Sequence, residues 1–172
     1  MKLCGLISVG AILGIILSAP GPAIAEPHLW KPGDAPPVVN GLKLGDSEQR
    51  ALDLLGVPDE VNPTTNGELL EYRTKGIEVT ATTKEGVTAI RLLSPEAGTI
   101  DGIRVGDIAR NVVLRWGAPQ MGTGRVAHFG TRDWIISVHL ADKESTIVDL
   151  TLALNRASPA PDSSTLNVFQ TQ

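Results

Sequence analysis

The chain is 172 residues long and carries 15 Lys and Arg against 19 Asp and Glu, a formal net charge of −4 at pH 7. An acidic chain without a basic patch argues against nucleic acid and against anionic lipid headgroups as partners. With three Trp, one Tyr and two Phe, it has too few aromatic residues to build a stacking platform for bases.

Residues 1–25 have the pattern of a secretory signal peptide. Lys2 precedes an uncharged, mostly apolar run over residues 3–19, and Ala23-Ile24-Ala25 has the small-residue pattern of a cleavage site. An uncleaved membrane anchor is the alternative, although the run is short for a membrane span and ends at a Pro-Gly-Pro break. We therefore expect cleavage after Ala25, which leaves no stable membrane anchor.

The single cysteine, Cys4, lies inside this apolar run. A mature chain that lacks it has no disulfide, no thiol nucleophile and no cysteine metal site, and we expect no cofactor. Export without disulfides fits a bacterial envelope. The predicted location is therefore periplasmic or secreted.

The two flanks of the mature chain have no hydrophobic periodicity. Residues 26–40 contain four prolines and predict an extended, Pro-rich arm. Trp30 lies in this arm and could fill a groove either of its own domain or of a partner. Residues 157–172 are polar and contain proline, which predicts a disordered tail.

An eighteen-residue pattern occurs twice without a gap. Residues 41–58 read GLKLGDSEQRALDLLGVP, and residues 102–119 read GIRVGDIARNVVLRWGAP. Internal repetition is considered first because it constrains the architecture before any single motif does. The repeat divides the chain into a predicted unit 1 over residues 41–95 and a predicted unit 2 over residues 96–156.

Each copy of the pattern has the start and stop signals of a short helix. An aspartate is expected as the N-cap, a glycine as the left-handed residue after the C-terminus, and a proline as the residue that prevents continuation. Gln49 is placed to complete a capping box in the first copy. The residues in these three roles are Asp46 and Asp107, Gly56 and Gly117, and Pro58 and Pro119.

Runs of alternating apolar residues follow each helix. They lie at 69–74, 77–83 and 87–93 in the first unit and at 126–131, 134–141 and 147–154 in the second. Alternation predicts antiparallel strands with one packed and one open face. The predicted fold class is α+β: two tandem repeats, each a short helix followed by a three-stranded antiparallel meander, with the helices on one face of the sheet. The two sheets could join edge to edge.

The open sheet face is the candidate interaction surface. Alternation assigns Val148, Leu150 and Leu152 to the packed face and leaves polar residues on the other. An ordinary solvated face is the alternative, since Thr is common on any exposed strand. Together with Trp30, the candidate interaction residues are Glu78, Thr80, Thr82, Arg91, Ile135, Ser137, His139, Asp149 and Thr151.

Catalytic and metal sites are not expected. His139 and Asp149 could be cross-strand neighbours, which suggests acid–base chemistry in a hydrolase, but a surface hydrogen bond explains the pair more simply. No recognisable motif supplies a nucleophile, and the three histidines lack metal-binding spacing. We therefore predict a protein that is not an enzyme.

The repeated pattern resembles two known families. It runs G-[LI]-[KR]-[LV]-G-D, then nine residues of helix, then G-x-P. This resembles the outer-membrane assembly lipoprotein E of the beta-barrel assembly machinery, and also beta-lactamase inhibitory protein, itself a tandem repeat. The resemblance spans roughly residues 41–154. It implies short helices packed on one antiparallel sheet and a non-catalytic protein–protein module of the bacterial envelope.

The expected function is that of an exported, non-enzymatic protein–protein interaction module of the bacterial envelope, with an envelope protein as its partner. Two alternatives stay open. One is a small-molecule or cell-wall-fragment binding module with a pocket between the units, lined by Trp30, Trp116 or Trp134. The other is an inhibitor of an extracytoplasmic enzyme.

Overall fold

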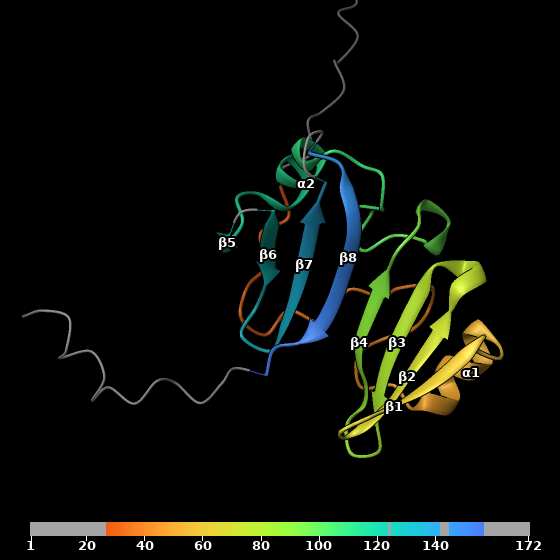
Figure 1. Cartoon of the computed structure of the whole chain (residues 1–172). Helices are drawn as coiled ribbons and strands as arrows, with labels where there is room; N and C mark the ends of the chain where they lie inside the picture. Colours follow the sequence, from red (N-terminus) through yellow and green to blue (C-terminus); the bar gives the residue numbers. More distant parts are fainter. Residues whose placement is uncertain (1–26, 124, 142–144, 157–172) are drawn as a thin grey trace, which may run out of the picture.

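The computed structural model describes residues 27–123, 125–141 and 145–156 (Figure 1). The predicted signal peptide and the predicted tail lie outside the described residues. Within the described ranges, no helix is long and apolar enough to cross a membrane.

The described residues form one eight-stranded antiparallel sheet with two short α-helices. The strand order is β1-β2-β3-β4-β8-β7-β6-β5. The first half contains α1 (Glu48–Leu55), β1 (Glu60–Thr64), β2 (Gly67–Tyr72), β3 (Ile77–Thr82) and β4 (Gly86–Leu92). The second half contains α2 (Ala109–Trp116), β5 (Met121–Thr123), β6 (Val126–Gly130), β7 (Trp134–Leu140) and β8 (Ile147–Leu154). Two 3-10 turns, η1 (Arg73–Lys75) and η2 (Pro95–Ala97), complete the elements.

The predicted fold class of two tandem repeats, each a helix with a three-stranded meander, is wrong. Each helix is followed by four strands, and β4 pairs with β8 from Ala89↔Ala153 to Leu92↔Leu150, so all eight strands form one sheet. The two missed strands, β1 and β5, are the edges of that sheet. Their sequences, EVNPT and MGT, show no apolar alternation, and Pro63 is a residue that sheets accept at an edge.

The start of α1 differs from the prediction. Its N-cap is Ser47, whose Oγ accepts a hydrogen bond from the backbone N–H of Arg50 at 3.2 Å. The predicted N-cap, Asp46, instead accepts the backbone N–H of Lys43 at 2.9 Å and closes the turn before the helix. The predicted capping box is also absent, because Gln49 donates to Asp53 Oδ1 at 3.0 Å.

The start of α2 repeats this arrangement without a capping side chain. Asp107 accepts the backbone N–H of Arg104 at 3.0 Å, and the N-cap position is Ile108, which makes no side-chain capping bond. The helix ends match the expected glycine signal in part. Gly56 and Gly117 have positive φ values of 83° and 77°, but their ψ values of −161° and −162° are extended and not left-handed helical.

The capping difference gives a first test. Replacing Ser47 with Ala is expected to lower the free energy of unfolding by about 1 kcal/mol, because one N–H of the first turn loses its acceptor. Gln49→Ala is the control, since its side chain bonds only an exposed carboxylate and alanine favours helix. Urea unfolding followed by circular dichroism measures both. If Gln49→Ala lowered the free energy of unfolding as much as Ser47→Ala, the result would favour the capping box that the sequence predicted.

The core lies on one face of the sheet, under the two helices. In Figure 1, α1 and the N-terminal segment lie behind the strands. Alternate residues of β3 and β7 point to this face and are buried, as their burial patterns show. The helices contribute Ala51 and Leu55 from α1 and Val112 and Trp116 from α2. The opposite face of the sheet is the open face.

A break in the alternation occurs where β7 pairs with β8. The register shifts between His139 and Leu140, and Leu140 pairs with Ile147. As a result Ile147 is buried, while Val148, assigned to the packed face by regular alternation, is 47% exposed. The assignment of Val148 is therefore wrong, because a β-bulge reverses the facing of the residues beyond it.

Candidate functional site

The open sheet face gathers nine of the ten predicted interaction residues. On β3, Glu78, Thr80 and Thr82 alternate with the buried residues. The open face continues from the first half of the chain to the second where β4 pairs with β8, a junction called the seam below. The pairs are Glu78↔Arg91, Arg91↔Thr151, Thr151↔Ser137, Asp149↔His139 and Ala153↔Ile135.

A row of like charges crosses the first three strands of this face. Glu60 of β1 lies opposite Glu71 of β2, which lies opposite Glu78 of β3. Directly opposed like charges destabilise a sheet, so this row needs counter-charges. Arg73 supplies one, with an ion pair to Glu60 and an Nε–Oε2 contact of 3.1 Å to Glu71. Arg91 supplies the other, at 3.3 Å from Glu78.

Asp149 is the most enclosed charged group of the face. Its side chain is only 8% exposed, and its Oδ2 accepts a hydrogen bond from Arg91 Nη2 at 2.9 Å. His139 Nδ1 lies 3.6 Å from the same oxygen. The hydrogen bond to Asp149 raises the pKa of the Arg91 guanidinium, an effect that desolvation opposes. Arg91 therefore joins Glu78 to Asp149 across the seam and stays charged.

A second histidine contact was not anticipated from the sequence. His128 Nδ1 lies 3.0 Å from Ser137 Oγ, a residue directly opposite in the register. Serine beside histidine is the pairing of an activated nucleophile, but acyl transfer also needs donors aimed at the developing oxyanion. On this open sheet face, the contact is that of a cross-strand hydrogen bond. Within the described ranges, no group of three or more His, Cys, Asp and Glu could hold a metal ion.

Trp30 does not belong to the same surface. Its ring lies edge-on to Trp134 with a centroid distance of 4.9 Å, on the packed side of the sheet. Trp134 Nε1 donates to the carbonyl oxygen of Asp34 at 2.8 Å, so the arm is tied to β7 at two points. The arm fills a groove of its own domain, and Trp30 is separated from the other nine residues by the sheet.

Three charged residues of the face were not singled out from the sequence. Glu71 could have been found, because it alternates with the buried Leu70 and Tyr72 in the predicted strand over 69–74. Arg73 follows that strand directly and turns back over it. Glu60 could not have been predicted from the sequence, because its strand shows no alternation of apolar and polar residues.

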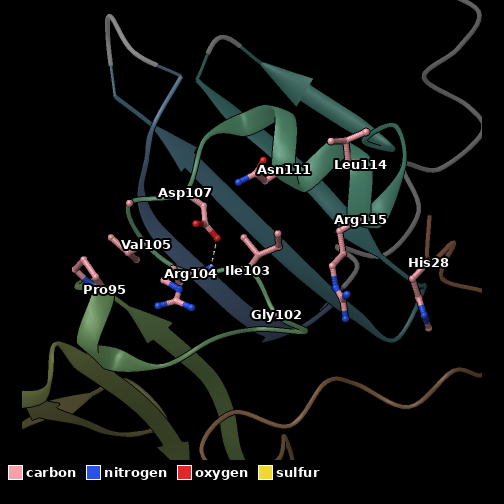
Figure 2. A pocket seen from close by; sticks show the side chains of 11 residues that line it. His28, Pro95, Gly102, Ile103, Arg104, Val105, Asp107, Asn111, Leu114 and Arg115 are labelled. Atoms are coloured by element: carbon pink, nitrogen blue, oxygen red, sulfur yellow. Dashed lines mark hydrogen bonds between the residues drawn. The ribbon is translucent and has the colours of Figure 1, made fainter. Parts of the chain in front are cut away.

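A cleft lies beside α2, on the helix side of the sheet and away from the open face. It is a cleft of about 990 Å³ between η2, the loop over residues 102–107 and α2, and Figure 2 shows its lining. The predicted ligand pocket was to be lined by tryptophan. Instead Trp116 and Trp134 are buried in the core, and neither they nor Trp30 line this cleft.

Comparison with known proteins shows the fold and not the family. No protein-family model and no curated protein matches the chain. One similar structure is an extracellular protein containing a SCP domain from Bacillus anthracis, with a TM-score of 0.54 and 10% identity over 72% of this chain. Another is a cysteine-rich secretory protein from Staphylococcus aureus, with a TM-score of 0.55 and 11% identity over 80% of this chain. The matches cover 45% and 57% of those proteins, so the chain spans about half of each.

Proposed function

We propose that the chain is an exported, non-enzymatic interaction module that binds an envelope protein through its open sheet face. The observation that carries the proposal is the continuity of this face across the β4–β8 seam, where Arg91 links Glu78 of the first half to Asp149 of the second. The signal-peptide pattern supports export, as does the likeness in fold to parts of an extracellular and a secretory protein. The resemblance to two families of envelope-associated, protein-binding modules supports the class of function.

The dimensions of the face suit a protein partner. Eight strands about 4.8 Å apart span about 34 Å across the sheet. With strands of five to eight residues in the centre, the face is comparable to the roughly 800 Å² that each partner contributes to a standard interface. Thr, Ser and paired charges predominate on it, so we expect a polar contact whose strength depends on complementary hydrogen bonds more than on apolar anchors.

Site-specific crosslinking tests the face. A photo-crosslinking amino acid at Thr80 or Thr151 samples the open face on either side of the seam, and the same group at Val113, exposed on α2, samples the helix side. In the envelope of the producing organism, we expect one protein to be crosslinked from both sheet positions and not from Val113. Thr151→Arg should weaken binding of that protein at least about tenfold, because it adds bulk and charge to the contact.

The controls distinguish specific binding at this face from nonspecific binding elsewhere on the surface. Gln49→Arg adds the same group to exposed α1, on the other side of the molecule, and should leave binding unchanged. Equal crosslinking from Val113 and from the sheet positions would contradict the proposal. So would a crosslinked protein whose binding survives Thr151→Arg.

A further inference from the structure

We propose that the cleft beside α2 is a binding site for a small organic anion that carries an apolar part, a carboxylate or phosphate group being the charged end. The cleft lies on the helix side, so this site is distinct from the open face and does not depend on it. Its volume of about 990 Å³ is at the upper end of the range typical of ligand pockets.

The charge of the lining points to an anion. Arg104 comes from the loop and Arg115 from α2, so two separate segments bring guanidinium groups to one cleft, and the arm adds the imidazole of His28. Asp107 is the acidic residue among them, and one of its oxygens already accepts the backbone N–H of Arg104. The lining therefore holds two guanidinium groups against one carboxylate, in a chain whose net charge is −4. Local charge of one sign in a cleft attracts ligands of the other.

Arg115 is held in place before any ligand arrives. Its Nε donates to the carbonyl oxygen of Asp101 at 2.6 Å, and its Nη2 lies 3.2 Å from Asp101 Oδ1. Asp101 offsets part of its charge, but the side chain remains half exposed with further N–H groups to donate. Gly102 leaves room for this placement, because a Cβ there would lie at a tight 3.2 Å from Arg115 Nε. A fixed guanidinium binds an anion at a lower entropic cost.

The first half of the chain lacks this arrangement at the equivalent positions. In the sequence repeat, Leu54 corresponds to Arg115 and Gly41 to Gly102. Leu54 packs over Gly41, with its Cδ2 3.5 Å from the position of a Cβ on that glycine. The same backbone therefore supports an apolar contact in one half and a positioned cation in the other. This difference singles out the second half as the place for an anionic ligand.

The remaining lining accounts for the apolar part of the ligand. Leu114 of α2 is 55% exposed beside the cleft, and Pro95 lines it from η2. Ile103 and Val105 form its floor and are themselves buried, at 3% and 6% exposure. In the view of Figure 2, Arg104 lies toward η2 and Arg115 toward the arm, with Ile103 between them. His28 is anchored at the arm end, because its backbone N–H bonds the carbonyl oxygen of Arg115 at 2.6 Å. A ligand along the cleft meets a cation at either end and the exposed Leu114 as its main apolar contact.

Titration with matched probes tests the site. Hexanoate and hexyl phosphate carry the two candidate anions on one apolar chain, 1-hexanol carries the chain alone and inorganic phosphate the charge alone. We expect one of the two amphipathic anions to shift the backbone amide signals of residues 102–107 and of α2 in a saturable way, more tightly than hexanol or phosphate. The anion that binds more tightly identifies the ligand class.

Two variants locate the binding. Arg104→Gln removes a cation whose side chain is in none of the ion pairs seen among the described residues, so the fold is expected to persist, and affinity should fall at least about tenfold. Arg110→Gln is the matched control, since this arginine lies on α2 and does not line the cleft. The proposal is overturned if neither anion gives saturable shifts, if hexanol binds as tightly as both anions, if the shifts map to the open face, or if Arg104→Gln leaves the affinity unchanged.

Discussion

Replacing Trp134 with Ala is expected to lower the free energy of unfolding by about 3–5 kcal/mol. The side chain is 1% exposed and lies at the start of β7, where the arm crosses the packed face. Its loss leaves a large cavity, removes the edge-on contact with Trp30 and frees the carbonyl oxygen of Asp34. Since domains of this size are stable by about 5–15 kcal/mol, the variant should lose a large share of its stability.

Two further variants divide this effect. Trp134→Phe keeps most of the buried ring and loses the indole hydrogen bond, at a cost of about 1–2 kcal/mol. Trp30→Ala removes the aromatic contact and leaves Trp134 in the core, at a cost of about 1–2 kcal/mol. Urea unfolding at constant m value measures all three. If Trp134→Ala cost no more than Trp30→Ala, the arm and not the core would be the source of the stability.

Alternation predicted the interior of the sheet and failed at its edges. The run at 147–154 coincides with β8, and the run at 77–83 differs from β3 by one residue. These strands have neighbours on both sides and one buried face, so their sequences must alternate. An edge strand such as β1 is held by one neighbour and by backbone hydrogen bonds, which place little demand on side chains. The missed edges, and not the helices, made the predicted fold class wrong.

Local sequence signals predicted the structure well where a backbone conformation requires one residue type. They predicted it less well where one side chain can form either of two hydrogen bonds. A glycine after each helix was required for the positive φ that both residues adopt. The aspartate before each helix could either cap it or close the preceding turn, and in both halves it closes the turn. Sequence spacing does not separate these two uses, because Asp accepts backbone N–H groups in either geometry.

The composition of the open face was predictable, but its electrostatics were not. Parity along each strand placed Glu78, Arg91 and Asp149 on one face, and the structure has them there. Asp149 lies next to the bulge that Val148 makes in β8 and between two neighbouring strands, an environment that no local pattern encodes. The cleft beside α2 likewise requires the arm, the loop and η2 to meet, so its basic lining was visible only in the structure.

Replacing Arg91 with Ala is expected to lower the free energy of unfolding by about 1–3 kcal/mol, because it leaves the enclosed carboxylate of Asp149 without its main donor. Arg91 is itself 43% exposed, so the penalty comes from the stranded Asp149 more than from a lost surface attraction. His139, at 3.6 Å, compensates poorly, since that distance exceeds a normal hydrogen bond. Glu78 also loses its partner on the adjacent strand.

A double-mutant cycle shows whether the seam between the halves depends on this pair. In the Asp149→Asn background, Arg91→Ala leaves no buried charge without a partner. It should therefore lower the free energy of unfolding markedly less than it does in the wild-type protein, which corresponds to a coupling energy of about 0.5–3 kcal/mol. Arg73→Ala is the surface control, because its ion pairs with Glu60 and Glu71 involve a side chain that is 64% exposed, and its effect on stability should be smaller than that of Arg91→Ala. Additive effects at Arg91 and Asp149, or a larger loss for Arg73→Ala, would mean that the β4–β8 junction is held by its backbone ladder and apolar core alone. Coupling would instead make Arg91 the residue that joins the two halves of the proposed interaction face into one surface.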